Sequence, residues 1–244
     1  MAGFRAKGAQ AFSDLVDAHG WAAIIVARTR TPQSVRRDTG DTMNPPRPQV
    51  DLYWDIGSTN TYFALKLIDP VLARTGARLV LHPFNLGPIF RRNNYVVLEE
   101  PPAKLSNRKR DLARWASRYD LPFRFPTVFP IKSSRVLRGA LAMRRFDLER
   151  AFIDRVFSAY WEHDDASIAD YAGLRPIVDA LGVDPVEFEA LSESADIRQA
   201  LIDSTDRGLA RGVFGVPSLV VGDEIFWGPD RMEFVEDELR RQTT

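Results

Sequence analysis

A proline at the start of a short apolar strand constrains the fold of this chain more than any other feature. The segment from Gly212 to Val221 reads GVFGVPSLVV. Proline cannot donate to a neighbouring strand, so within a sheet it is confined to edges, to bulges and to the first residue of a strand. The bond before proline becomes cis at a cost of only about 0.5–1 kcal/mol. A proline at the start of such a strand is of the kind often held cis. We predict a strand over 218–221 and a cis bond at Val216–Pro217, which leaves the Val216 backbone open to an extended ligand.

Residues 50–82 have a strand–helix–strand pattern. Residues 50–56 are apolar enough for a buried strand, and Gly57 and Ser58 mark a turn before apolar residues recur at helical spacing over 62–74. Gly76 is typical of a helix end, and residues 78–82 follow as a second strand. Two strands joined by a helix in one sheet run parallel with a right-handed crossover.

The middle of the chain predicts helices, and strands return only near its end. The expected helices cover 104–119, 133–146, 148–163, 168–181, 185–192 and 196–211, followed by strands at 218–221 and 224–227 and a last helix over 230–241. We predict an α/β protein with a thioredoxin-like fold, in which a helical domain is inserted between the two halves. The expected boundaries are 49–100 for the first half, 101–194 for the insertion and 195–244 for the second half.

Residues 1–48 differ from the rest and are interpreted as an N-terminal extension. The stretch over 29–49 is polar and contains four prolines, a composition typical of linkers. Met43 lies within it, just before the first strand. Two interpretations stay open: a mis-assigned translation start, or a weakly structured and partly disordered arm with one short helix near 11–19.

The composition excludes several classes of chemistry. The chain has 244 residues and no cysteine, so it can bury a large core but cannot form a dithiol redox centre, a cysteine zinc site or a cysteine nucleophile. The three histidines, His19, His82 and His163, form no pair with ligand spacing on one helix, and we expect no metal site.

Charge and hydropathy bound the expected partners and location. Lys plus Arg and Asp plus Glu both number 33, so no net charge attracts nucleic acid or an anionic membrane surface. The apolar run from Trp21 to Ala27 is far shorter than the roughly 20 residues that span a bilayer, and no cleavage signature follows it. We therefore expect a soluble cytoplasmic protein with neither nucleic acid nor membrane as a partner.

Ser58 lies where the first strand turns into the first helix. Free backbone N–H groups and the positive end of the helix dipole stabilise an anion at such a corner. A thiolate placed there has a lowered pKa. If the fold is thioredoxin-like, the thiol must arrive with a ligand because the chain has no cysteine, and glutathione is then the obvious candidate. The alternative is that Ser58 or Asn60 only caps the helix; the two roles are compatible.

From Val50 onward the chain resembles the 2-hydroxychromene-2-carboxylate isomerase family, relatives of kappa-class glutathione transferases in the DsbA-like thioredoxin superfamily. The resemblance rests on the order and spacing of four blocks. They are DIGS at 55–58 with YFA at 62–64; HPFNLG at 82–87 leading to Asn93 and Asn94; PAK at 102–104 with DLARWA at 111–116 and PFRFP at 122–126; and GVFGVP at 212–217 through FWGPDR at 226–231.

The resemblance implies a glutathione site. Ser58 would contact the sulfur as the catalytic residue, and Asn94, with Asn93 as the alternative, and Lys104 would hold the tripeptide. The backbone before Pro217, at Val216, would pair with the cysteinyl unit. Asp230 would receive the γ-glutamyl ammonium, and Arg231 would orient that carboxylate.

Each of these residues also has a purely structural interpretation. Asp230 is a good first-turn acid for the last helix, Lys104 a solvated helix residue, and Asn93 and Asn94 turn residues. Trp227 lies at an apolar position typical of a core. Two residues depart from the family pattern: Thr59 stands where relatives usually have proline, and Pro229 where a small or polar residue is common.

The activity implied by the resemblance is glutathione-dependent isomerisation of a small conjugated aromatic keto acid, of the 2-hydroxychromene-2-carboxylate or trans-o-hydroxybenzylidenepyruvate type, in aromatic catabolism. Relatives are commonly dimers, so we expect a homodimer. Two alternatives remain: a kappa-like transferase that forms stable conjugates, and a non-catalytic module that binds glutathione or a peptide. Disulfide exchange is excluded by the absence of cysteine.

Overall fold

The computed structural model of the chain describes residues 47–96 and 99–242. They belong to one compact unit, Asn44–Thr244. The expected helix near 11–19, Met43, His19 and nearly all of the expected extension lie outside the described residues.

A four-stranded mixed sheet has the strand order β2-β1-β3-β4. Its strands are β1 (Gln49–Trp54), β2 (Arg78–Pro83), β3 (Ser218–Val221) and β4 (Glu224–Trp227). β1 and β2 are parallel, whereas β3 runs antiparallel to both β1 and β4. Because Tyr53 pairs with Ser218, the end of β1 lies beside the start of β3. This register places two segments that are distant in sequence side by side at one end of the central strands.

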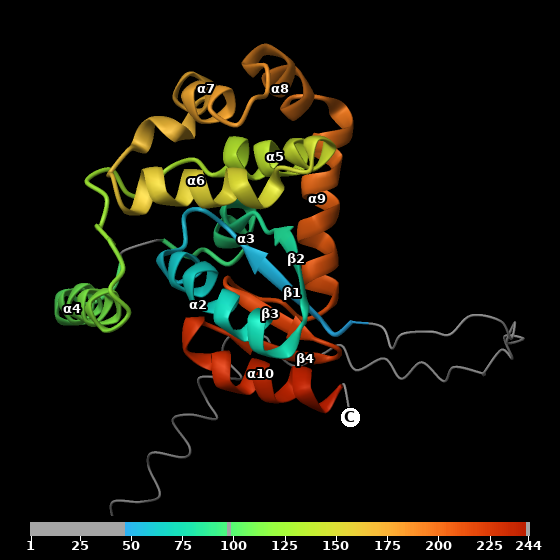
Figure 1. The fold of residues 1–244 in the computed structure, drawn as a ribbon. Coiled ribbons are helices and arrows are strands. Elements are labelled where there is room, and N and C mark those ends of the chain that lie inside the picture. The colour runs from blue at the N-terminus through green and yellow to red at the C-terminus, as the bar shows by residue number, and fades with distance from the viewer. Residues whose placement is uncertain (1–46, 97–98, 243–244) are drawn as a thin grey trace, which may run out of the picture. The chain divides into compact units, whose positions relative to one another are not determined.

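Helices surround this sheet (Figure 1). α2 and α10 lie together on one side, α9 runs along β2, and α5 to α8 form a group beyond the strand ends. The helices are α2 (Thr59–Thr75), α3 (Leu86–Arg92), α4 (Pro102–Arg118), α5 (Ser134–Met143), α6 (Glu149–Trp161), α7 (Tyr171–Asp179), α8 (Pro185–Ser192), α9 (Ala195–Ala210) and α10 (Met232–Arg241), with 3₁₀ turns at Arg144–Phe146, Ala166–Ala169 and Pro229–Arg231. None of the helices in the described part of the chain has the length and apolar character needed to cross a membrane.

The predicted thioredoxin-like fold with helices between its halves is confirmed. Where the predicted ends of helices differ from the observed ones, the cause is local. α2 begins at Thr59 rather than at 62, because the Ser58 side chain accepts from the Thr61 N–H and caps the helix there. Gly76 ends α2 in the left-handed conformation, as expected, with φ of 67°. The last helix begins at Met232, since a 3₁₀ turn precedes it.

The segment 86–92 was not predicted as a helix but forms α3. Its sequence contains a glycine and a proline, both poor helix formers. Two tertiary features compensate for this. The Asn85 side chain accepts from the Gly87 N–H at 3.2 Å, and Ile89 is buried in a cluster with Phe84 and Val216.

Candidate functional site

Ser58 joins the start of α2 to the loop before β3. Its Oγ donates to the Val216 carbonyl oxygen at 3.1 Å and accepts from the Thr61 N–H at 3.3 Å. The Val216–Pro217 peptide is cis, as predicted. The structure therefore brings Ser58 together with Val216 and Pro217, although Ser58 and Val216 are 158 positions apart in the sequence.

The corner at Ser58 suits an anion. The first N–H groups of α2 point toward it, and the dipole of this 17-residue helix places positive charge there. The helix-cap interpretation of Ser58 is confirmed, whereas Asn60 is exposed and does not cap. Thr59 retains a backbone N–H at the first helical position that the family's usual proline would lack.

Asp55 stabilises this corner through buried hydrogen bonds, a role that was not predicted from the sequence. The residue is 1% exposed. Its Oδ1 accepts from the Gly57 N–H at 2.8 Å, and its Oδ2 accepts from the Leu86 N–H at 3.0 Å and the Ser133 hydroxyl at 3.1 Å. Burial raises the pKa of Asp55, and the three hydrogen bonds offset part of that rise. Asp55 thus connects the Ser58 turn with the starts of α3 and α5.

The far side of the corner is formed by the turn after β4. The Gly228 N–H donates to the Pro217 carbonyl at 3.0 Å, which holds the two turns together. Asp230 follows two residues later and forms an ion pair with Arg231. Pro229, buried at this turn, has no N–H to offer a ligand.

Trp227 is half-exposed, so the expectation that it belongs to the core is wrong. Its ring lies 5.4 Å from that of Phe214, which is also half-exposed. A Cβ on Gly215 would lie 3.1 Å from the indole nitrogen. Two aromatic rings therefore flank the loop that carries Val216, on the surface rather than inside.

Asn94 and Lys104 lie apart from these contacts. Asn94 is exposed and has φ of 50°, a turn conformation after α3, and Asn93 is the C-cap of that helix. Lys104 pairs with Glu100 at 2.9 Å, and this interaction lowers the pKa of Glu100. Within the described ranges neither residue forms a hydrogen bond or ion pair with Ser58, Val216 or Asp230.

The described histidines take part in ordinary polar contacts. His82 Nε2 lies 2.9 Å from Asp51 Oδ1, and His163 Nδ1 contacts the Ser158 carbonyl at 3.1 Å. Among residues 47–96 and 99–242, no group of three His, Cys, Asp or Glu side chains is placed to hold a metal ion.

Comparison with known proteins defines the family. Residues 49–240 match the DsbA-like thioredoxin domain family. The 2-hydroxychromene-2-carboxylate isomerase of Pseudomonas sp. (strain C18) is 30% identical over 77% of this chain and 88% of its own length. Glutathione S-transferase kappa 1 of Caenorhabditis elegans is 23% identical over 81% of this chain and 93% of its own length. A solved 2-hydroxychromene-2-carboxylate isomerase superposes with a TM-score of 0.69 and 27% identity, covering 80% of this chain and 96% of the other. The chain therefore belongs to the DsbA-like thioredoxin domain family and, within it, to the 2-hydroxychromene-2-carboxylate isomerases.

Proposed function

We propose that this protein is a glutathione-dependent isomerase of a conjugated aromatic keto acid of the 2-hydroxychromene-2-carboxylate type. The observation that carries the proposal is the contact of Ser58 Oγ with the Val216 carbonyl, at a helix start beside a cis proline, in a chain without cysteine. The residues fit a ligand that brings its own thiol. Glutathione would supply a thiolate that adds reversibly to a conjugated double bond, permits rotation about it, and leaves unchanged.

The protein's own groups would stabilise and position that thiolate. The Ser58 hydroxyl can turn from Val216 to donate to sulfur while the dipole of α2 favours the negative charge. The Val216 backbone would pair with the cysteinyl unit. Asp230, held by Arg231, would accept the γ-glutamyl ammonium. In this proposal Asn94 and Lys104 hold the other end of the tripeptide, which requires Lys104 to leave Glu100.

Kappa-like conjugation is the second candidate, supported by the kappa relative. The two reactions differ in what happens to glutathione. An isomerase leaves total free thiol constant over many turnovers, whereas a transferase consumes one thiol for each product. The more similar relatives are isomerases, and they favour the first candidate.

The test is a calorimetric titration with glutathione, combined with thiolate absorbance and a turnover assay, on the parent protein, Ser58→Ala and Ser117→Ala. Ser117 is exposed near the end of α4 and serves as the matched control. We expect the parent and Ser117→Ala to bind glutathione with a lowered thiol pKa. Ser58→Ala should lose most of the thiolate signal and about 10²–10³-fold in turnover, the usual effect of removing one donor to a developing charge.

Three results would contradict the proposal. Absence of glutathione binding by the parent removes its basis. Stoichiometric loss of free thiol during turnover replaces isomerisation with conjugation. Normal binding with an unshifted thiol pKa and no turnover indicates the non-catalytic module.

A further inference from the structure

A pocket lies between α3, α5 and α9, three helices that Figure 1 shows converging beside the end of β2. Its volume is about 540 Å³. That size lies within the range of small-molecule sites, which are mostly apolar with a few polar groups. The apolar part of its wall comes from α3 and α9: Pro88, Ile89, Leu201, Ile202 and Leu209. Ser58, Val216 and Asp230 do not line it.

Three arginines from three different helices stand around this pocket: Arg92 on α3, Arg138 on α5 and Arg198 on α9. Arg138 and Arg198 share one carboxylate, that of Glu193, so one of these two positive charges is not neutralised by it. The Arg92 side chain is exposed and has no ion-pair or hydrogen-bond partner in the described part of the chain. Asp206 is the one acidic residue among the lining side chains of the described ranges. The pocket therefore combines an apolar wall with an excess of guanidinium groups.

We propose that this pocket binds a small carboxylate carried on an apolar ring. The planar guanidinium group matches a carboxylate with two parallel hydrogen bonds, and Arg92 has both donors available. The ring would cover Ile202, which is 52% exposed, and the neighbouring Ile89 and Leu209. The pocket shares the Ile89 cluster with Val216, but none of Ser58, Val216 and Asp230 lines it, and the inference does not depend on the proposed reaction.

Benzoate is the probe, and the experiment is isothermal titration calorimetry on the full chain. The parent protein should bind benzoate, and benzamide, which has the ring but no charge, should bind about tenfold more weakly. Arg92→Ala should weaken benzoate by a similar factor, as expected for a charge-assisted pair. Ile202→Ser should weaken both probes, because it removes apolar surface that either ring would cover.

Two control variants show whether the probe binds in this pocket or elsewhere on the protein. Arg91→Ala removes another exposed arginine of the same helix, one that does not line the pocket, and it should leave benzoate binding within about twofold. Ser58→Ala should also leave it unchanged. The proposal is overturned if the parent does not bind benzoate at millimolar concentrations, if Arg91→Ala and Arg92→Ala weaken it equally, or if Ser58→Ala abolishes binding. The last result would place the probe at the Ser58 corner instead.

Discussion

At the scale of single residues, Asp55 is the buried group on which the Ser58 turn depends. All three of its partners are donors, so both oxygens must accept. In Asp55→Asn an amide NH₂ group replaces one of the two carboxylate oxygens. That NH₂ group would face a buried N–H or O–H donor, and neither could accept a hydrogen bond from the other. We expect the free energy of unfolding to fall by about 1–3 kcal/mol, measured by urea denaturation at neutral pH.

Asp55→Asn should also alter the proposed site itself. Because Gly57 and Leu86 are held by the carboxylate, the variant should weaken glutathione binding more than Ser117→Ala does. A variant as stable as the parent would show that the carboxylate is not required for the turn.

Asp51 makes stability depend on pH. Burial raises its pKa, but hydrogen bonds from His82, Arg211 and Gln49 outweigh burial and lower the pKa to about 2 from the ordinary 3.8. A carboxylate with a lowered pKa stabilises the fold above its unfolded pKa, and that stabilisation is lost as pH falls. Solvent screening reduces the effect, so we expect Asp51→Asn to lose about 1–2 kcal/mol at neutral pH. The difference from the parent should shrink between about pH 4 and pH 2.

The control for this prediction is Asp203→Asn, an intermediate-exposure site on α9 whose oxygen can still accept from Gln199. Its unfolding free energy should stay within about 0.5 kcal/mol of the parent at each pH. A constant difference between Asp51→Asn and the parent over the whole acid range would contradict the assignment.

Residues with local signals could be predicted from the sequence, and residues with distant partners could not. The cap at Ser58 follows from neighbouring residues, and the cis bond at Val216–Pro217 was predicted from the likeness of its segment to the second half of a thioredoxin-like fold. The role of Asp55 depends on Leu86 and Ser133, which only the fold brings near. The contribution of Asn94 and Lys104 to a ligand site stays a prediction.

At the scale of elements, α9 approaches the sheet closely because Gly208 has no side chain. A Cβ there would lie 2.9 Å from ring carbons of Phe84 and Tyr53. Alanine favours a helix by about 1 kcal/mol over glycine, yet the clash must displace α9 or the rings. Overpacking costs about 1–3 kcal/mol, so after the helix-propensity gain we expect Gly208→Ala to be less stable than the parent by up to about 2 kcal/mol.

Thermal unfolding of Gly208→Ala beside Arg207→Ala measures this effect. Arg207 is the exposed neighbour on the same turn, so its replacement by alanine tests a substitution there without the clash and should change stability little. If Gly208→Ala were the more stable of the two, the close approach of α9 would not limit the packing.

Element types were easier to predict than their ends. α8 has its predicted bounds, Pro185–Ser192, because proline suits a first helical position and the Asp184 carboxylate caps the helix. The predicted helix over 133–146 instead ends at Met143 and continues as a 3₁₀ turn to Phe146. Asp147 then adopts a left-handed conformation, with φ of 56°, that stops it. No short-range sequence pattern predicted this change from α-helix to 3₁₀ turn. α3 was not predicted because the contacts that stabilise it are tertiary.

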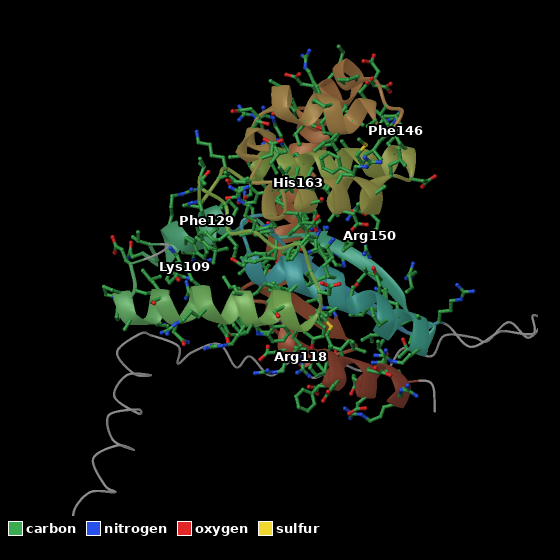
Figure 2. All side chains as sticks on the ribbon, turned by 60° about the vertical axis from the view of Figure 1, so that its left-hand side comes forward. Lys109, Arg118, Phe129, Phe146, Arg150 and His163 are labelled. Atoms are coloured by element: carbon green, nitrogen blue, oxygen red, sulfur yellow. The ribbon has the colours of Figure 1, made fainter. Side chains whose placement is uncertain are left out.

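At the scale of the whole molecule, the helices between the two halves share their core with the sheet. Trp54 of β1 lies 5.8 Å from Phe157 of α6, and the buried Trp161 Nε1 donates to the Ile56 carbonyl at 2.9 Å. Arg150 on α6, labelled in Figure 2, pairs with Asp69 of α2 at 2.8 Å. The sequence predicted an insertion over 101–194. It did not predict that the insertion and the sheet would form one continuous core, because that depends on side chains from both parts.

Such a shared core predicts that the two parts unfold together. Helix content by far-UV circular dichroism and tryptophan fluorescence should give one coincident urea transition for the full chain. Trp161→Phe leaves the buried Ile56 carbonyl without its donor, so the free energy of unfolding should fall by about 1–3 kcal/mol and the urea midpoint should fall with it. The two signals should still coincide. Trp227→Phe, at a half-exposed ring, is the matched control and should change stability little. If helix content were lost in a separate, earlier transition, the insertion would be an independent domain and its contacts with β1 and α2 would not couple it to the sheet.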